Sequence, residues 1–333
     1  MSDVTIFAPS PILTVTVEDH PDGSEIHVHP GGQGAWQARM LVGLGVRVTM
    51  CCVLSGEIGV VVRHLLEDQG IEVDAVEREG RGAAYLHDRR SGERREVAAE
   101  HGDPIGRHEL DELYGTVLRR GLESDATILS GPSDEAALPA DTYRRLAADL
   151  RAGGATVIAD LAGERLTAVL DGGVDLLKVS DEELRTDGLA AADDLSSISR
   201  AMHELRSRGA NAVIVTRAGE PFLLVDDDGV LEVTPPRLEV ADHRGAGDSL
   251  LAGTVAGIVR GERPRDAITL GAAAGALNVT RHGLGTGDAD TVASLRSRAT
   301  TRVLDEHAGE RAVSGRLTPE GLAALAAPRD EEE

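Results

Sequence analysis

The stretch "ADHRGAGDSLLAG", residues 241–253, places two glycines and an alanine directly before Asp248. Apolar residues then recur at the spacing of a helix, so the stretch predicts a helix that starts at the glycines; they are Leu251, Val255 and Ile258. Free backbone N–H groups and the positive end of the helix dipole bind anions at such a start. Gly245, Ala246 and Gly247 are therefore a candidate phosphate cradle.

Asp248 allows two interpretations. An acid in the first turn of a helix often does no more than cap it or complement its dipole. A cap needs no glycines, however, and a carboxylate beside a phosphate cradle can take the proton from a substrate hydroxyl during phosphoryl transfer. The familiar nucleotide motifs do not decide the question, since there is no Gly-Lys phosphate loop and no glycine-rich dinucleotide turn after the first strand.

Composition narrows the class of partner. The chain has 333 residues, 41% of them hydrophobic and 2% aromatic, and a formal charge of −23. Such a charge repels nucleic acid and anionic lipid, and the shortage of aromatic rings disfavours base stacking. No apolar run reaches the roughly 20 residues that span a bilayer, and no secretory signal opens the sequence. We expect a cytoplasmic protein with a small-molecule partner and without nucleic-acid or membrane binding.

Two residue types are used sparingly. The only cysteines, Cys51 and Cys52, are adjacent in a strand-like run and are expected to be reduced and buried. Lys178 is the only lysine among 34 basic residues. A compact ammonium can do what a guanidinium cannot, but a lone lysine can also be chance, and composition leaves both alternatives open.

The order of the elements predicts the fold. Short β-rich runs alternate with amphipathic ones, which indicates a three-layer α/β/α domain with a mainly parallel sheet. The strand candidates are 4–8, 46–54, 126–131, 155–160, 174–180 and 211–217. Segments 12–30 and 82–99 instead resemble hairpins, and a small separate sheet of this kind could be a lid or a dimer edge. We expect one domain over 1–305 and a peripheral extension with an acidic tail over 306–333.

Five spaced motifs resemble one family in the same order along residues 4–295. "DHRGAGD" is similar to the D-T-x-G-A-G-D signature of ribokinase-like, phosphofructokinase-B-type carbohydrate kinases, and "GGQGAWQARMLVGLG" at 31–45 to their second signature. "LLKVSDEEL", "VIVTRAGEPFLL" and "VTRHGLGTG" resemble further family motifs. The branch of 1-phosphofructokinases and tagatose-6-phosphate kinases looks most similar.

The resemblance implies a role for each matching residue. Asp248 would be the general base, and the backbone of Gly245, Ala246 and Gly247 the anion hole for the γ-phosphoryl group of ATP. Lys178 would lie near the ATP phosphates, and Glu183 would help to organise Mg²⁺ through water.

Further positions follow from the resemblance. Thr216 to Gly219 would border the nucleotide and Ala272 to Gly275 the adenine, while Gly31 and Gly32 would let a sugar approach the backbone. Asp242 matches a position in the family's ion loop, so a monovalent cation is a possible further cofactor. A homodimer would form through the lid.

The acceptor side departs from the family pattern. Thr14 stands at the position of a sugar-binding aspartate, and Gln33 and Trp36 replace a lysine and an asparagine. Arg81 matches an arginine that binds substrate phosphate, although Ala83 replaces the asparagine after it. The sequence thus predicts an ATP-dependent kinase for a sugar or sugar phosphate. The alternatives are a non-catalytic ligand-binding or regulatory protein on the same fold, and a kinase for a nucleoside or cyclitol.

Overall fold

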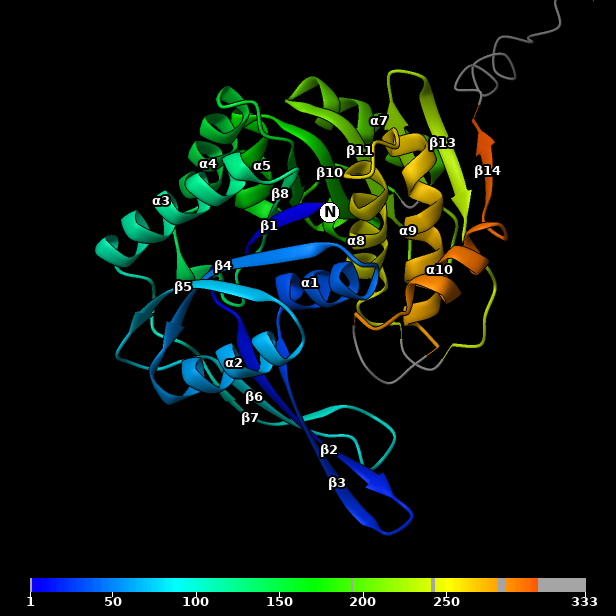
Figure 1. Ribbon diagram of the computed structural model, residues 1–333. Helices are drawn as coiled ribbons and strands as arrows, with labels where there is room; N and C mark the ends of the chain where they lie inside the picture. Colours follow the sequence, from blue (N-terminus) through cyan, green and yellow to red (C-terminus); the bar gives the residue numbers. More distant parts are fainter. Residues whose placement is uncertain (1, 193, 241–242, 281–284, 305–333) are drawn as a thin grey trace, which may run out of the picture.

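A computed structural model of the chain describes residues 2–192, 194–240, 243–280 and 285–304. Its centre is a ten-stranded sheet in the order β14-β13-β12-β11-β10-β9-β8-β1-β4-β5 (Figure 1). Neighbours from β11 to β5 in this order pair in parallel, and β12, β13 and β14 add antiparallel pairs at one edge. The strands are β1 (Asp3–Phe7), β4 (Arg47–Ser55), β5 (Glu72–Arg78), β8 (Ala126–Ser130), β9 (Val157–Asp160), β10 (Val174–Ser180), β11 (Ala210–Thr216), β12 (Phe222–Asp226), β13 (Gly229–Thr234) and β14 (Thr300–Val303).

Helices cover both faces of this sheet, because its central strands are apolar on both sides. Every residue of β8 and β9 is buried. One hydrophobic core lies under α1 (Gln33–Gly43), α2 (Gly56–Asp68), α8 (Ala246–Ile258), α9 (Pro264–Asn278) and α10 (Ala289–Arg296). The other lies under α3 (Arg107–Glu123), α4 (Asp141–Ala152), α5 (Gly163–Gly172), α6 (Asp181–Thr186) and α7 (Leu195–Ser207), with a 3₁₀ turn at Glu135–Ala137. The predicted three-layer ribokinase-like architecture and its parallel strands are confirmed.

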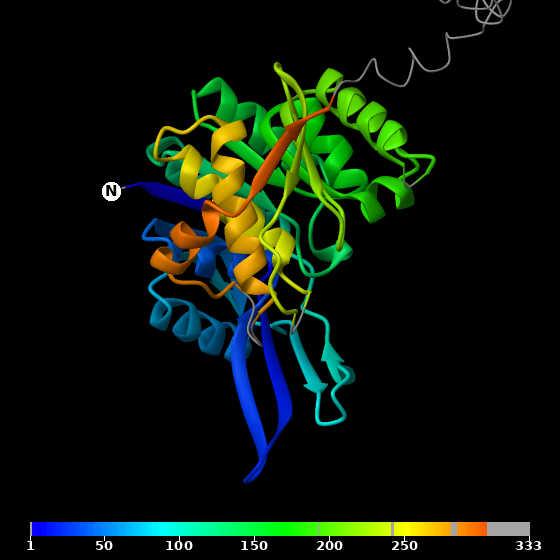
Figure 2. The ribbon, with the colours of Figure 1, turned by 90° about the vertical axis from the view of Figure 1, so that its right-hand side faces the viewer.

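The two predicted hairpins form one small sheet, the lid, which projects from the body (Figure 2). Its order is β3-β2-β6-β7, and the parallel pairing of β2 with β6 joins the hairpins. The strands are β2 (Ile12–His20), β3 (Gly23–Gly31), β6 (Ala84–Asp88) and β7 (Arg95–Glu100). Leu13 and Val15 pack into the core near α2, while Thr14 and Thr16 are buried on the opposite face.

Two further expectations have an outcome in the fold. Cys51 and Cys52 are free and fully buried in β4, and burial raises the pKa of the Cys51 thiol to about 12. Across the ranges that the structure describes, no helix is both long and apolar enough to cross a membrane. The predicted extension, 306–333, lies outside those ranges.

Polar residues collect where four neighbouring parallel strands end. Ser130 closes β8, Asp160 closes β9, Ser180 closes β10 and Thr216 closes β11. The register places Ser130 beside Asp160 and Ser180 beside Thr216. In open α/β sheets ligands bind at this carboxyl edge, so the topology directs attention there.

Glycines allow α8 and α9 to pack closely, and this packing holds α8 in position against α9. A Cβ added to Gly253 would lie 2.8 Å from Ala274 Cβ, and one added to Gly271 would lie 2.2 Å from Thr254 Oγ1. Real Cβ atoms do not approach so closely, so larger residues here would push the two helices apart.

Candidate active site

The start of α8 has the geometry of an anion cradle. Gly245 occupies the N-cap position in a left-handed conformation with φ of 67°, and no side chain caps the helix. Glycine adopts this conformation without the strain that other residues would suffer. Asp248 lies in the first turn and is not the cap. The N-cap is therefore Gly245, and Asp248 is placed where an acid complements the helix dipole.

Lys178 lies directly against this cradle. A Cβ added to Gly247 would lie 3.2 Å from both Cε and Nζ of Lys178, so the absence of a side chain at Gly247 makes room for the ammonium group. Lys178 is only 7% exposed although it belongs to a central strand. The structure thus brings together the sole lysine and the glycines that the sequence analysis had linked to phosphate binding.

Asp160 is the ion partner of Lys178. Lys178 Nζ donates a hydrogen bond to Asp160 Oδ1 at 3.0 Å, and Gln37 Nε2 donates one to Asp160 Oδ2 at 3.0 Å. Asp160 is 1% exposed, so its charge depends on these partners rather than on water. Burial disfavours the charged form of Lys178, but the carboxylates of Asp160, Asp248 and Glu183 outweigh it and raise the pKa of the amine.

The pKa of Asp248 is shifted into the range of a general base. Burial raises it to about 7, and the carboxylates of Asp160 and Glu183 add to the shift. Lys178 and a hydrogen bond from Gln37 act in the opposite direction. A base is most effective when its pKa lies near the working pH. The surroundings of Asp248 therefore suit proton abstraction at neutral pH.

Glu183 has a structural role that the sequence analysis did not foresee. Its Oε2 accepts a hydrogen bond from the backbone N–H of Ser180 at 2.7 Å, and its own backbone N–H donates to Ser180 Oγ at 3.1 Å, which forms a capping box at the start of α6. In the part of the chain that the structure describes, no three His, Cys, Asp or Glu side chains converge as a metal cage. Mg²⁺ at nucleotide sites usually keeps several waters and needs only one or two carboxylates, so this donor set still fits the ion.

The base of the lid meets the start of α1 at the acceptor side. A Cβ on Gly31 would lie 2.4 Å from Thr14 Oγ1, so Thr14 packs against this glycine. Gly32 has a φ of 99° and precedes α1, and the backbone N–H of Gly131 donates to Gln33 Oε1 at 2.8 Å. The side chain of Gln33 thereby ties α1 to the end of β8.

Trp36 combines a helical position with an unsatisfied polar atom. It is partly buried in α1, and its indole Nε1 is buried without a hydrogen-bond partner among the residues that the structure describes. A buried N–H without an acceptor is costly, and ligand oxygens are one way to satisfy it.

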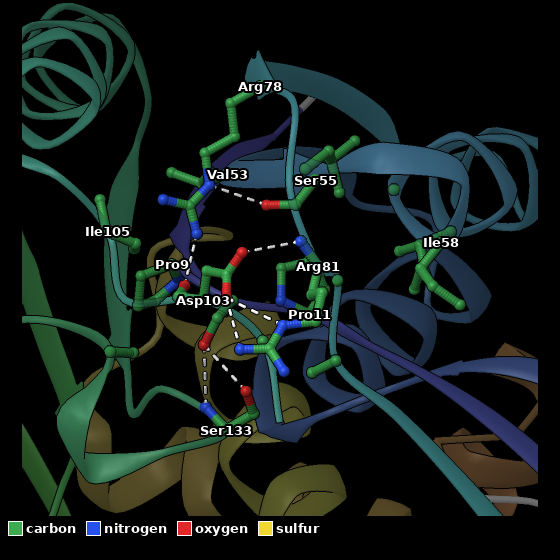
Figure 3. Close-up of a pocket in the computed structure, with 18 of the residues that line it drawn as sticks. Pro9, Pro11, Val53, Ser55, Ile58, Arg78, Arg81, Asp103, Ile105 and Ser133 are labelled. Atoms are coloured by element: carbon green, nitrogen blue, oxygen red, sulfur yellow. Dashed lines mark hydrogen bonds and ion pairs between the residues drawn. The ribbon is translucent and has the colours of Figure 1, made fainter. Parts of the chain in front are cut away.

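Arg81 lines a small pocket between the ends of β4 and β5 and the loop before α3. Figure 3 shows its guanidinium facing Asp103, to which Nε and Nη2 donate at 3.1 and 3.0 Å. Arg78 in the same pocket donates to Ser55 Oγ at 2.8 Å. The free volume is about 30 Å³, room for little more than a water molecule. Arg81 is thus engaged by a carboxylate in this conformation.

The residues expected around the nucleotide fall into two groups. Thr216 ends β11 at the carboxyl edge, and Gly219 is exposed in the turn that follows. Ala272 is instead 1% exposed in the core, and a Cβ on Gly275 would lie 2.9 Å from the carbonyl oxygen of Ala246. The structure gives Ala272 and Gly275 a role in packing α9 against α8.

Comparison with known proteins agrees with this geometry. The family model for the pfkB family carbohydrate kinases matches residues 3–291. The chain belongs to the pfkB family of carbohydrate kinases.

Relatives of this family cover most of their own length and of this chain. A 1-phosphofructokinase of Bacillus subtilis is 28% identical over 289 residues, which is 84% of this chain and 92% of that protein. A 1-phosphofructokinase of Haloferax volcanii is 30% identical over 270 residues, with 81% and 85% covered. Crystal structures of Escherichia coli phosphofructokinase-2 exist with potassium and with fructose-6-phosphate, and they match this structure with TM-scores of 0.78 and 0.77. Each is 23% identical in sequence, and each match covers 90% of this chain and 99% of the E. coli chain. This protein is accordingly an ATP-dependent carbohydrate kinase.

Two residues of this pfkB site escaped sequence reasoning. Asp160 was visible only as the last residue of a strand, and Gln37 only as a polar position in an otherwise apolar helix. A usable signal existed for Asp160, because acids at the carboxyl ends of adjacent parallel strands meet at one edge. Gln37 offers no such signal, since its contact with Asp160 joins positions 123 residues apart.

Proposed function

We propose that Asp248 is the general base that deprotonates the acceptor hydroxyl, while the start of α8 and Lys178 stabilise the charge on the transferring phosphoryl group. One observation carries this proposal: Asp248 lies in the first turn of a helix that starts at glycines, and the buried Lys178 ammonium lies against those glycines. The raised pKa of Asp248 supports it. When bound, ATP supplies the γ-phosphoryl group. General-base catalysis of this kind contributes roughly 10²- to 10⁴-fold to the rate.

The order of steps follows from the positions of the residues. The lid and the glycines at Gly31 and Gly32 admit the acceptor and exclude water. Lys178 and the N–H groups at Gly245, Ala246 and Gly247 offer positive charge that is already in place, so little reorganisation is needed as negative charge develops. Asp248 takes the hydroxyl proton as the new oxygen–phosphorus bond forms.

Glu183 and the residues after β11 would serve the metal and the nucleotide. Thr216 and Gly219 stand at the same sheet edge as Lys178, which supports a nucleotide site there. Ala272 and Gly275 would shape that site indirectly, through the packing of α8 and α9. A monovalent cation remains part of the proposal, because a potassium complex exists for the E. coli relative; Asp242 itself lies outside the described residues.

The acceptor is a sugar phosphate in this proposal, and basic residues around the lid support it. His29 and His87 lie on the same face of the lid as Thr14 and Thr16, the residues that they pair with in register. Arg94 contacts His87 Nε2, and the other ring nitrogen of His87 is buried without a partner among the described residues. Burial, followed by Arg39 and neighbouring basic groups, lowers the pKa of His29 to about 4. An anionic acceptor would relieve this crowding of like charges.

The homodimer is also a proposal. Ile26 and Val28 on β3 are 66% and 46% exposed, and an apolar edge of this kind is typical of a strand that a partner covers.

The test measures ADP release from purified protein with ATP, Mg²⁺ and separate acceptors: fructose 1-phosphate, fructose 6-phosphate, tagatose 6-phosphate, unphosphorylated sugars, nucleosides and polyols. We expect turnover with a phosphorylated sugar, and a loss of at least about 10²-fold in Asp248→Asn. Asp68→Asn, an exposed acid on α2, is the matched control and should keep wild-type turnover. Turnover that survives in Asp248→Asn, or ligand binding without turnover for any acceptor, would overturn the proposal.

A further inference from the structure

A continuous hydrogen-bonded chain leads to Asp160 and Lys178, and its central member is Gln37. This side chain is fully buried in α1. Ser130 Oγ donates to Gln37 Oε1 at 2.5 Å, and the hydroxyl of Tyr143 donates to the carbonyl oxygen of Ser130 at 2.9 Å. The chain thus runs from α4 through the end of β8 to α1.

The chemistry of its neighbours fixes which way the Gln37 amide points. A carbonyl oxygen only accepts hydrogen bonds and an amide nitrogen only donates them. With Oε1 on the hydroxyl of Ser130, Nε2 faces Asp160 Oδ2 at 3.0 Å. The reversed amide would set its oxygen against a buried carboxylate, where both groups are acceptors. Ser130 therefore holds the amide in the orientation that donates.

The carboxylate of Asp160 is satisfied on both oxygens by different kinds of donor. Gln37 binds Oδ2, and the Lys178 ammonium binds Oδ1 at 3.0 Å. Burial and the carboxylates of Asp160 and Glu183 raise the pKa of Asp248, and the Lys178 ammonium lowers it. The nearby Gln37 amide also acts in the direction opposite to burial.

We propose that Gln37 is a positioning residue for phosphoryl transfer: its amide, oriented by Ser130, binds Asp160 and thereby keeps the Lys178 ammonium on Asp160 and against the cradle that precedes Asp248. The inference rests on the proposed function, in which Asp248 is the base. Near Asp248, a neutral amide favours the charged form of the base without the strong depression of basicity that direct pairing with an ammonium would cause. Lys178 meanwhile stays beside Gly247, where it can meet a phosphoryl group.

The test compares Gln37→Leu and Ser130→Ala with the wild type through the pH dependence of kcat/KM. The wild type should lose activity as the pH falls through about 7, because the base becomes protonated. Loss of a hydrogen bond that favours the charged form raises the pKa of an acid, so Gln37→Leu should move this acid limb upward by about one unit. Ser130→Ala, which frees the amide to turn, should shift it in the same direction by less.

Thr127→Val is the matched control. Thr127 is fully buried in β8, its hydroxyl has no partner among the described residues, and its removal should leave the acid limb where it is. A residue that merely fills space would lower activity or thermal stability in Gln37→Leu without moving the pH profile. If Gln37→Leu does not fold, the pH dependence of kcat/KM in Ser130→Ala tests the inference by itself.

A second readout works without turnover. Carboxyl ¹³C NMR of aspartate-labelled protein, assigned by the signal lost in Asp248→Asn, follows the titration of Asp248 directly. A titration near 7 that rises in Gln37→Leu supports the positioning role even if no acceptor is turned over, in which case only the proposed function fails. An Asp248 titration that is the same in the wild type, Gln37→Leu and Ser130→Ala overturns the inference.

Discussion

The two parts of the proposed site are built in different ways. At the transfer end, Asp160, Lys178 and Gln37 are almost fully buried, and fixed partners satisfy their polar atoms. At the acceptor end, Arg81 is 69% exposed in its side chain, and its partner Asp103 lies in the loop before α3. In the proposed site, phosphoryl transfer would depend on buried charges that are costly to change, whereas acceptor recognition would use exposed residues that can change without unfolding the core. This difference explains why the family motifs persist at one end and depart at the other.

The largest effect should come from Lys178→Met. Breaking a buried ion pair on one side typically costs about 3 to 5 kcal/mol, since Asp160 keeps an uncompensated charge. Loss of the cation beside the cradle should also lower kcat by about 10²-fold or more with every acceptor. Thermal unfolding and steady-state kinetics measure the two effects.

The control for that variant is Arg302→Met, which breaks an exposed pair with Glu232. Exposed pairs contribute about 0 to 1 kcal/mol, so stability and turnover should hardly change. A Lys178→Met enzyme with a kcat within threefold of the wild type would show that the buried ammonium is not needed for phosphoryl transfer, which would contradict the contrast between the two parts of the site.

A smaller effect is expected from Gly247→Ala. The new Cβ would lie 3.2 Å from Lys178 Cε and Nζ, so the ammonium must move by a few tenths of an ångström. We expect kcat to fall about tenfold while the KM for the acceptor is kept, because a small displacement at the reacting centre is costly.

Gly115→Ala sharpens this result as a matched control. Gly115 lies in α3 with open space around its Cα, and alanine is about 1 kcal/mol more favourable than glycine inside a helix. Its activity should equal that of the wild type, with stability equal or higher. Equal kcat values in both alanine variants would show that Lys178 is not confined by Gly247.

The smallest effect should come from Arg81→Ala at the acceptor end. Its ion pair with Asp103 is largely exposed, so stability should change by about 1 kcal/mol or less. We expect a severalfold higher KM for the phosphorylated acceptor and an unchanged KM for ATP, measured by varying each substrate in turn. Arg90→Ala, which breaks an exposed pair with Asp88 in the lid, is the control. A change in the KM for ATP alone would contradict the proposed position of Arg81 on the acceptor side.

Sequence reasoning succeeded where the determining interactions are local. The strand ending at Ser180, the helix beginning at Ala246 and the hairpin of β2 and β3 each carry their own periodicity and turn residues, so their positions could be predicted. The phosphate cradle could be predicted for the same reason, since the glycines and the helix that presents them are adjacent.

Long-range contacts limited the rest. The pairing of Asp160 with Lys178 and the bridge from Gln37 depend on which strands become neighbours, which no local pattern specifies. The same limit applies to Arg81, whose partner Asp103 follows the second hairpin of the lid. The small residues Ala272 and Gly275 indicated only that something packs closely against them, and either a ligand or a facing helix could do so.

Because Lys178 is the only lysine in the chain, cleavage after it can report on unfolding of the central sheet. A protease that cuts only after lysine has one target in the whole chain, and that target lies within β10 between two parallel neighbours. Cleavage into two fragments therefore requires the centre of the sheet to separate, so the rate of appearance of those fragments measures global unfolding rather than fraying of the lid.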